Sequence, residues 1–318
     1  MRALVLTAGL GTRLQPLTLA RAKAAAPVDG EPLARRTIRW LVSHGIRDLV
    51  LNLHHKPESI TAAVGDGADL GARVRYSWES PVLGSAGGPR RALPLLVDPR
   101  PFPDGSPVAE DGIFVLVNGD TLTDVDLPRM IRTHRASGAM VTMALIPNPR
   151  PDKYGGVLLD DGHAVTGFTR RGSSGSSFHF IGPQVVQAAV FGDLADGVPA
   201  ETVLELYPRL MRERPGSVRG FPGDWSFQDI GTPADLLETS LALASADGRP
   251  DRPRWGRGAR VDPSARVTRS VLWDEVTIGA GAEVEECVVA DGVAVPPGAR
   301  YRRAALVNGP AGLVVSPL

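Results

Sequence analysis

The sequence contains one cysteine, Cys287, and only three lysines, Lys23, Lys56 and Lys153, among its 35 basic residues. A single cysteine excludes an internal disulfide, which fits a reducing compartment. Because only three of the 35 basic residues are lysines, arginine supplies most of the positive charge of this chain. A lysine here is mildly informative, because its compact ammonium suits sites that a planar guanidinium does not.

The chain also lacks an excess of either charge and any long apolar run. Its 35 basic residues balance 35 acidic ones, so nucleic acid is not an expected partner, although a compact phosphate site is compatible with a neutral total. No apolar stretch approaches the roughly 18–20 residues that a membrane span needs, and the opening run MRALVLTAGLGTR is too short in apolar residues for a signal peptide. The six histidines show no zinc spacing with the cysteine. We therefore expect a cytoplasmic protein with no membrane partner.

Short apolar runs alternate with helix-like segments in the first half of the chain, which predicts an α/β domain with a mostly parallel sheet. Residues 139–182 have the alternation of antiparallel strands, and residues 98–111, rich in proline and acid, predict an exposed excursion. The expected strands are residues 2–7, 48–53, 73–78 and 113–117. The expected helices begin near residues 34, 57 and 89 and continue near 183–190, 201–213 and 233–245. We expect this domain to span residues 1–245.

The tail repeats with a period of 17 residues. Val261, Ile278 and Val295 are one such series, and Ala265, Ala282 and Ala299 are another. Short strands separated by recurrent turn residues are typical of a parallel β-helix, in which one coil stacks on the next; the alternative is a small antiparallel meander. We expect a linker at 246–260 and a short β-helix at 261–318 that leans on the main domain or on another subunit.

The first expected strand runs into a glycine-rich loop, Ala8-Gly9-Leu10-Gly11-Thr12-Arg13-Leu14. Glycines let several backbone N–H groups approach one anion, and Arg13 beyond them could grip a phosphate with two donors. A dinucleotide fingerprint would need a third glycine where Leu14 stands, and the Gly-Lys-Ser/Thr of a P-loop is absent. Taken alone, the loop leaves both a phosphate site and a structural turn open.

The larger pattern is more specific. Residues 6–32, LTAGLGTRLQPLTLARAKAAAPVDGEP, resemble the opening signature of the sugar-1-phosphate nucleotidylyltransferases, and further motifs of that family follow in order. The tail resembles the left-handed β-helix of mannose-1-phosphate guanylyltransferases and their relatives. The resemblance covers essentially the whole chain and implies a Rossmann-like, mixed and mostly parallel sheet followed by a short left-handed β-helix. The further motifs are LGSAGG at 83–88, VNGD at 117–120, YGG at 154–156 and DIGTP at 229–233.

The resemblance implies transfer of a nucleotidyl group from an NTP to a sugar 1-phosphate, with release of pyrophosphate. Both reactants are anions, so catalysis needs cations and positioning more than a covalent nucleophile. Arg13 would hold the β- and γ-phosphates, and Lys23 would lie against the α-phosphate or the sugar phosphate. Asp120 and Asp229 would bind Mg²⁺. The structural alternatives are a solvated loop lysine, a turn aspartate and a helix-capping aspartate.

The remaining site residues divide between the nucleotide and the sugar. The nucleotide side comprises Ala8, Gly9, Gly11, Thr12, Arg13, Glu79, Gly84 and Ser85. The sugar-phosphate side comprises Asn118, Gly155, Gly156 and Arg171. Structural alternatives are a flexible surface turn at 84–88 and a strand bulge at 155–156.

The sequence departs from the family in two places. The motif proline before Lys23 is Ala22, and Arg170-Arg171 stand where many relatives carry Glu-Lys. Arg171 could replace the lysine charge, but Arg170 cannot accept hydrogen bonds from sugar hydroxyls. The favoured substrates are GTP or UTP with mannose 1-phosphate or a related hexose 1-phosphate.

Two other functions stay open. One is a glucose-1-phosphate thymidylyl- or uridylyltransferase, and the other is a non-catalytic regulatory subunit of the same fold. Retention of Arg13, Lys23, Asp120 and Asp229 together favours an enzyme. Association of copies through the tail is also expected, but dimer and tetramer are not distinguished.

Overall fold

The computed structural model describes residues 1–98, 100 and 112–318. Nearly all of the excursion expected over residues 98–111 therefore lies outside the described residues. Contacts between residues divide the chain into two compact units. Each unit combines separate stretches of the chain, whereas the domains expected from the sequence, residues 1–245 and 261–318, are continuous. Unit 1 comprises Met1–Gly9, Thr37–His54 and Val64–Phe227, and unit 2 comprises Leu10–Arg36, His55–Ala63 and Gln228–Leu318.

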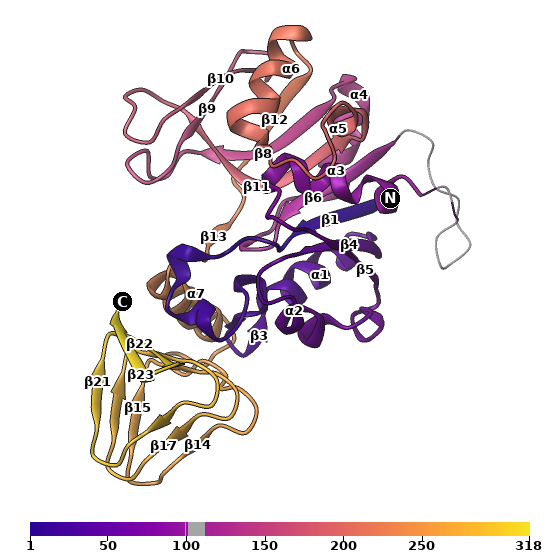
Figure 1. The fold of residues 1–318 in the computed structure, drawn as a ribbon. Helices are drawn as coiled ribbons and strands as arrows, with labels where there is room; N and C mark the ends of the chain where they lie inside the picture. The colour runs from indigo at the N-terminus through magenta and orange to yellow at the C-terminus, as the bar shows by residue number, and fades with distance from the viewer. Residues whose placement is uncertain (99, 101–111) are drawn as a thin grey trace. The chain divides into compact units, whose positions relative to one another are not determined.

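Unit 1 is built on a nine-stranded mixed sheet (Figure 1). Its strands β6, β1, β4 and β5 pair in parallel, whereas β9, β10 and β11 pair in antiparallel fashion. This confirms the expected α/β fold. The strands are β1 (Arg2–Leu6), β4 (Asp48–Leu53), β5 (Arg73–Trp78), β6 (Ile113–Asn118), β8 (Val141–Pro147), β9 (Gly156–Leu159), β10 (Val165–Thr169), β11 (Phe178–Gln187) and β12 (Val218–Pro222), and β7 (Thr121–Thr123) lies outside this sheet.

Helices of unit 1 pack on this sheet, with α3 against β1 and α4 against β8. Two sequence expectations need correction. Helix α3 begins at Gly84 and not near residue 89, so residues 84–88, for which a surface turn was the structural alternative, are helical. Residues 183–187, the first part of the helix expected near 183–190, continue β11, where Val185 and Val186 are fully buried between β6 and β8. The helices are α1 (Leu33–Ser43), α2 (Pro57–Val64), η4 (Ala68–Leu70), α3 (Gly84–Leu96), α4 (Leu127–Ser137), α5 (Ala189–Gly192), η5 (Thr202–Leu206) and α6 (Tyr207–Glu213); α1 and α2 cross from one unit to the other.

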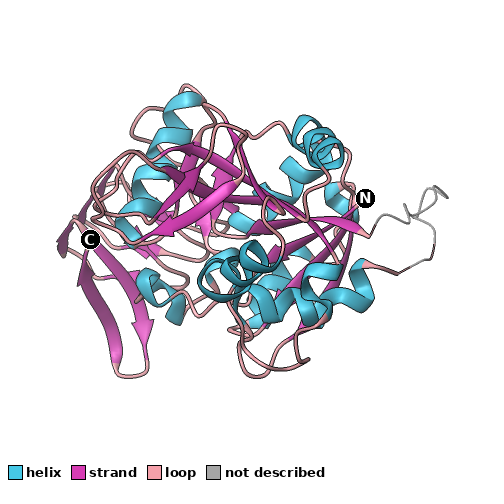
Figure 2. Ribbon diagram, turned by 90° about the horizontal axis from the view of Figure 1, so that it is seen from above, coloured by secondary structure: helices cyan, strands magenta, loops and turns pink. Residues whose placement is uncertain are grey.

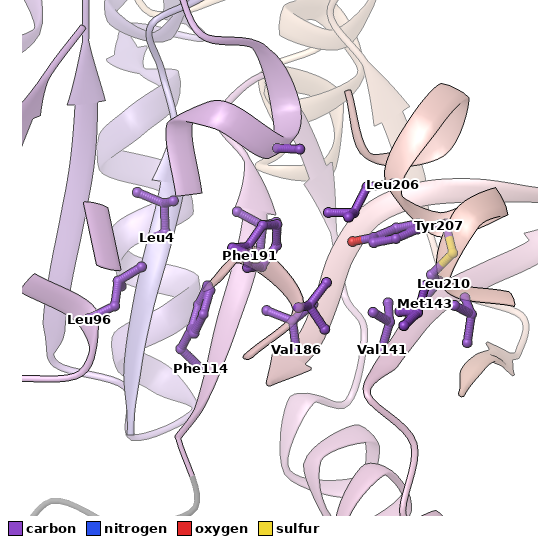
Figure 3. Close-up of a cluster of buried hydrophobic side chains, with 14 of the residues drawn as sticks. Leu4, Leu96, Phe114, Val141, Met143, Val186, Phe191, Leu206, Tyr207 and Leu210 are labelled. Atoms are coloured by element: carbon purple, nitrogen blue, oxygen red, sulfur yellow. The ribbon is translucent and has the colours of Figure 1, made fainter. Parts of the chain in front are cut away.

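The core of unit 1 gathers buried side chains from strands far apart in the sequence (Figure 3). Leu4 and Phe114 come from adjacent parallel strands, and the ring of Phe114 lies 6.0 Å from that of Phe191. Tyr207 is fully buried, and its hydroxyl donates to Gln184 Oε1. Burial of such apolar surface is the main term that holds the sheet and its helices together.

Unit 2 begins with residues 10–36, which contain most of the signature segment (residues 6–32) and fold into short turns of helix and a two-stranded hairpin before α1 begins. Helix α7 starts where Thr232 accepts a hydrogen bond from the Asp235 N–H and the Asp235 carboxylate binds the Thr232 N–H in return. Thr232, and not Asp229, therefore caps this helix. The elements are η1 (Thr12–Leu14), η2 (Leu17–Leu19), η3 (Lys23–Ala25), β2 (Pro27–Val28), β3 (Glu31–Pro32) and α7 (Pro233–Ala246), while β13 (Phe227–Asp229) spans the boundary between the units.

The rest of unit 2 is a parallel β-helix whose coils stack in the 17-residue register expected from the sequence, as Val261↔Ile278↔Val295 shows. The pairing is parallel between coils, which excludes the meander for these strands. A final antiparallel hairpin, β22–β23, carries the C-terminus (Figures 1 and 2). The strands are β14 (Arg260–Val261), β15 (Arg266–Thr268), β16 (Val271–Leu272), β17 (Thr277–Ile278), β18 (Glu283–Glu285), β19 (Val288–Val289), β20 (Ala294–Val295), β21 (Arg300–Arg302), β22 (Ala304–Gly309) and β23 (Gly312–Pro317). Among the described residues, no helix has the length and apolarity needed to cross a bilayer.

Candidate functional site

The carboxyl ends of three parallel strands meet at one edge of the unit 1 sheet. Val5 of β1 pairs with Leu51 of β4, and Leu6 pairs with Asn118 of β6. Ala8 therefore follows β1 at the same edge where Asn118 ends β6. In open α/β sheets, ligands bind beyond this edge.

Asn52, near the end of β4, organises this edge. Its Oδ1 accepts hydrogen bonds from the N–H groups of Thr7 at 2.6 Å and Ala8 at 3.3 Å, and the Thr7 hydroxyl donates to the Asn52 carbonyl. Its Nδ2 donates to Glu79 Oε1 at 2.6 Å. One buried amide thus fixes the start of the glycine loop and the end of β5. Sequence analysis missed Asn52, although a polar residue inside the apolar strand DLVLNL was the available signal.

Glu79 is 3% exposed and joins Asn52 to the 83–88 segment. Its Oε2 accepts from the Leu83 N–H at 2.9 Å. A Cβ on Gly88 would lie 2.6 Å from Glu79 Oε1 and 3.0 Å from Asn52 Nδ2, so only glycine fits there without displacing this pair. The predicted base-recognition stretch is thereby anchored to the same amide as the glycine loop.

The start of α3 is fixed by Gly84 and Ser85. Gly84 has a positive φ of 74°, and a Cβ on it would lie 2.7 Å from the Ala200 carbonyl oxygen, which excludes the flexible turn considered above. The Ser85 hydroxyl donates to Glu201 Oε2 at 2.5 Å and accepts from the Thr202 N–H at 2.9 Å. Its hydroxyl therefore holds residues 201–202, and contact of Ser85 with a nucleotide stays a prediction.

Asn118 and Asp120 flank a glycine that binds the end of β1. The Gly119 N–H donates to the Leu6 carbonyl at 3.0 Å, and a Cβ on Gly119 would lie 2.7 Å from that oxygen. Both flanking side chains are half-buried. The VNGD motif thus places the amide of Asn118 and the carboxylate of Asp120 near the end of β1, where the glycine loop begins.

The predicted sugar side of unit 1 contains three aromatic rings that sequence analysis did not assign. Tyr154 stacks on His179 with ring centres 4.2 Å apart, and Phe227 meets the His179 ring edge-on at 5.0 Å. Burial lowers the pKa of His179 to about 4, although a hydrogen bond with the Gly155 backbone acts in the opposite direction. His179 is therefore neutral near pH 7 and contributes shape and a hydrogen bond rather than charge.

Gly156 is sterically required at the start of β9. A Cβ there would lie 2.4 Å from Ser177 Oγ and 2.5 Å from Thr169 Oγ1, and its own N–H donates to Thr169 at 3.1 Å. The strand packing thus explains this glycine. Contact of Gly155 and Gly156 with a sugar stays a prediction, as does the role of Arg171, whose exposed side chain follows β10 beside the exposed Arg170.

In unit 2, the glycine loop closes over Lys23. Gly11 has a positive φ of 61°, and a Cβ on it would lie 2.9 Å from Thr18 Cγ2 and 3.1 Å from Lys23 Cβ. Lys23 begins η3 and is only 9% exposed. A solvated loop lysine is therefore excluded, because this side chain is packed inside the fold of the signature segment.

Arg13 reaches from η1 toward the DIGTP motif. Its Nη1 lies 3.9 Å from Asp229 Oδ2, and its side chain is 63% exposed whereas that of Asp229 is 9% exposed. A Cβ on Gly231 would lie 2.8 Å from the same Nη1. The structure thus places Arg13 beside Asp229, with a guanidinium at the surface and a carboxylate beneath it. Lys23 lies in the same compact unit.

The carboxylates of Asp120 and Asp229 are oxygen donors of the kind that Mg²⁺ binds. Mg²⁺ takes oxygen ligands, commonly one or two carboxylates together with water and substrate phosphates. Among the described residues no group of three or more His, Cys, Asp or Glu side chains could hold a metal ion. Asp120 belongs to unit 1 and Asp229 to unit 2, and their joint binding of the ion stays a prediction.

Comparison with known families agrees with this arrangement. A family model described as nucleotidyl transferase matches residues 2–246, and a second, described as GlmU-like C-terminal hexapeptide, matches residues 255–302. The first match covers the sheet, the signature segment and both motif aspartates.

Individual proteins resemble the chain over most of its length. A mannose-1-phosphate guanylyltransferase of Mycobacterium tuberculosis is 26% identical, with 89% of this chain and 82% of the relative covered. A UTP–glucose-1-phosphate uridylyltransferase of Synechocystis is 27% identical, with 78% of this chain and 64% of the relative covered. The solved structure of HddC from Yersinia pseudotuberculosis complexed with GMP-PN has a TM-score of 0.63 at 21% identity and covers 76% of this chain and 99% of its own. That likeness shows a common fold.

Proposed function

The chain belongs to the nucleotidyl transferase family, and from that premise we propose that it transfers a nucleotidyl group from an NTP to a sugar 1-phosphate. A phosphate oxygen of the sugar 1-phosphate attacks the α-phosphorus of the NTP in line. The new P–O bond forms as the bond between the α-phosphorus and its bridging oxygen breaks, and pyrophosphate leaves. The products are an NDP-sugar and pyrophosphate.

The observation that carries this proposal is the pairing of Arg13 with Asp229 in the same compact unit that holds the buried Lys23. Asp229 is far from Arg13 and Lys23 in the sequence, yet all three residues belong to the same compact unit of the fold. Two cations and one carboxylate suit a reaction between mutually repelling anions, since the barrier is largely charge repulsion and orientation.

Each cation has a distinct part in this proposal. Arg13 presents an exposed fork of N–H donors, which matches the oxygens of the departing β- and γ-phosphates. Lys23 is held in the fold of the signature segment, so its ammonium is a compact, positioned charge for the α-phosphate or the sugar phosphate. Asn52 holds the Thr7 and Ala8 N–H groups in place and so shapes the backbone before the glycines.

Members of this family generally use a divalent metal, and we propose Mg²⁺ here, bound by Asp120 and Asp229. When bound, it would neutralise charge on the triphosphate. The two carboxylates supply the hard oxygen ligands that this ion prefers.

We favour a guanylyltransferase acting on mannose 1-phosphate, because the relative from Mycobacterium tuberculosis bears that name and matches 89% of the chain. The relative from Synechocystis, a glucose-1-phosphate uridylyltransferase, keeps UTP with glucose 1-phosphate as the second candidate. A non-catalytic regulatory subunit is the alternative from another class.

A substrate matrix tests these proposals. The purified full chain is incubated with MgCl₂, each of GTP, UTP, dTTP, ATP and CTP, and each of a panel of hexose 1-phosphates, and pyrophosphate release is measured. We expect release with GTP and mannose 1-phosphate. Release only with another pair would correct the substrates, and no release with any pair would favour the regulatory subunit.

Variants then test the residue roles. Arg13→Ala, Asp120→Asn and Asp229→Asn should each lower kcat/KM by about 10²–10³-fold, the usual loss when a transition-state charge partner is removed. Arg260→Ala, an exposed arginine on β14, is the matched control and should leave kcat/KM unchanged. Full activity of Asp120→Asn at limiting MgCl₂ would refute the metal assignment.

Other expectations remain proposals at this stage. They are a cytoplasmic location, the absence of nucleic-acid and membrane partners, association of copies through the β-helix, and domain boundaries at residues 245 and 261. Sedimentation of the purified chain would decide its oligomeric state.

A further inference from the structure

The β-helix repeats an aspartate whose carboxylate also binds backbone N–H groups of the tail, since Asp274 Oδ1 accepts from the Arg257 N–H at 2.8 Å. Asp274 and Asp291 occupy the same position in consecutive coils, 17 residues apart, and Asp291 Oδ1 accepts a hydrogen bond from the Asp274 N–H at 3.1 Å. Stacking therefore places two carboxylates side by side. Adjacent like charges destabilise paired strands, so this arrangement calls for a cation.

Two arginines supply it: the exposed Arg257, whose Nη2 lies 3.7 Å from Asp274 Oδ2, and Arg21 of the signature segment, which makes the shorter contacts. Its Nε and Nη2 donate to the two oxygens of Asp291 at 2.6 Å each, and Nη2 also donates to Asp274 Oδ2 at 2.6 Å. The guanidinium carbon lies 5.8 Å from the centre of the buried Trp273 ring. The Arg21 side chain is 18% exposed and those of Asp274 and Asp291 are 23% and 29% exposed, so these bonds are partly shielded from water and salt.

Arg21 lies at the point where the signature segment turns toward Lys23. The next residue, Ala22, has φ −57° and ψ 149°, and this φ is the one that the motif proline of the resembling family would fix by its ring. Alanine imposes nothing of the kind. Its N–H instead donates to Ser59 Oγ at 3.0 Å, a bond that proline could not make.

The contact with the β-helix is not confined to Arg21. Helix η2, just before it in the chain, packs against β22, and Leu17 of that helix is fully buried. The segment that carries Arg13 and Lys23 is thus attached to the β-helix by an apolar contact and by a forked ion pair.

We propose that Arg21 is a positioning residue through which the β-helix holds the signature segment in its phosphate-binding shape. The Arg21 pairs with Asp274 and Asp291 restrain the backbone on one side of Ala22, and the Ser59 hydroxyl restrains it at Ala22 itself. Together they replace the restraint that a proline would supply. The catalytic consequence rests on the proposed function, but the restraint itself does not.

Amide hydrogen exchange of the full chain tests the restraint without an activity assay. Arg21→Ala should raise the exchange rates of residues 10–26 by about tenfold or more, because local opening becomes easier when a partly buried ion pair is lost. Arg302→Ala is the matched control. It removes an exposed β-helix pair, with Glu285 Oε2 3.4 Å from Arg302 Nε, and should leave these residues unchanged.

A double-mutant cycle identifies the partners. Asp274→Asn with Asp291→Asn keeps the shape and the acceptor oxygens but removes the charge, and should raise exchange over residues 10–26 as Arg21→Ala does. Combining all three changes should add little, because the interaction is already lost. Unchanged exchange in Arg21→Ala, or fully additive effects, would overturn the proposal.

Steady-state kinetics, measured with the substrates that the matrix shows to be active, tests the effect of Arg21 on catalysis. Arg21→Ala should lower kcat/KM for the NTP by about tenfold, since a small misplacement of positioning groups is expensive in rate, and Arg21→Lys should recover part of the loss. Unchanged kcat/KM in a variant with raised exchange would overturn the catalytic role.

If the wild-type chain releases no pyrophosphate, the proposed function fails, and hydrogen exchange alone then tests whether Arg21 restrains the signature segment. If Arg21→Ala does not fold, Arg21→Lys and the paired asparagine variant carry the same tests.

Discussion

Replacing Asn52 by leucine tests the view that one buried amide organises the sheet-edge part of the site. Leucine keeps the approximate volume of the side chain but removes its acceptor and its donor. The Thr7 N–H then loses a partner at 2.6 Å, and the Glu79 carboxylate loses a donor at 2.6 Å. Both of these residues are buried, so water cannot replace what is lost.

The magnitude follows from the kinds of hydrogen bond removed. A buried N–H left without a partner loses about 1–3 kcal/mol, and a hydrogen bond to a charged group contributes about 1.5–3 kcal/mol, so we expect Asn52→Leu to lower the free energy of unfolding by about 3–5 kcal/mol. The backbone at Ala8 also loses its anchor. We expect kcat/KM for the NTP to fall by about 100-fold, because small displacements near reacting groups have large effects on rate.

Urea unfolding and pyrophosphate-release kinetics measure the two effects. Tyr207→Phe is the control, because it removes a buried hydrogen bond with Gln184 in the core of the same unit. It should lower the free energy of unfolding by about 1 kcal/mol and leave kcat/KM unchanged. An Asn52→Leu protein with wild-type stability and wild-type kcat/KM would refute the assignment of Asn52 as the organising residue.

Three further predictions concern the other parts of the molecule. Gly231→Ala should lower kcat/KM about tenfold with little change in stability, because its Cβ would displace the flexible end of Arg13, 2.8 Å away; steady-state kinetics of a folded variant with unchanged rates would contradict this. His179 has a pKa of about 4 in the folded chain because of burial, below the usual 6.5, so the unfolded state binds more protons between these values and stability should fall as the pH drops from 6.5 to 4. Urea titrations should show a weaker pH dependence in His179→Gln, and identical curves would count against the burial effect. Thr232→Ala should lower the free energy of unfolding by about 1 kcal/mol through loss of the α7 cap with Asp235, without changing the KM for the NTP; an unchanged unfolding curve would show that the cap contributes nothing.

Some site features were predictable from local sequence because local geometry requires them. Gly11 and Gly84 both have positive φ, a conformation that glycine adopts without strain, and both were singled out from their motifs. Lys23 was marked by its motif and by the scarcity of lysine. These assignments depend on residues that are close in the sequence, so a local sequence pattern is enough to predict them.

Other features depend on partners that are distant in sequence. Asn52 contacts residues 45 positions before it and 27 positions after it, and no local pattern indicates those contacts. The same holds for Arg21, whose partners follow it by 253 and 270 positions. The helix expected near 183–190 was wrong over residues 183–187 for a related reason, because pairing of these residues with two neighbouring strands outweighs their local preferences.

Most of the order of strands and helices, the 17-residue stacking of the tail and the glycines of the signature segment could be predicted from the sequence alone, because each depends on periodicity or on backbone conformation at a single position. Tertiary structure alone decided that Lys23 is buried, that Arg13 lies beside Asp229, and that a β-helix coil binds the signature segment through Arg21. The physical reason is that burial and charge pairing depend on distance in space, which chain folding brings about between residues that the sequence keeps far apart.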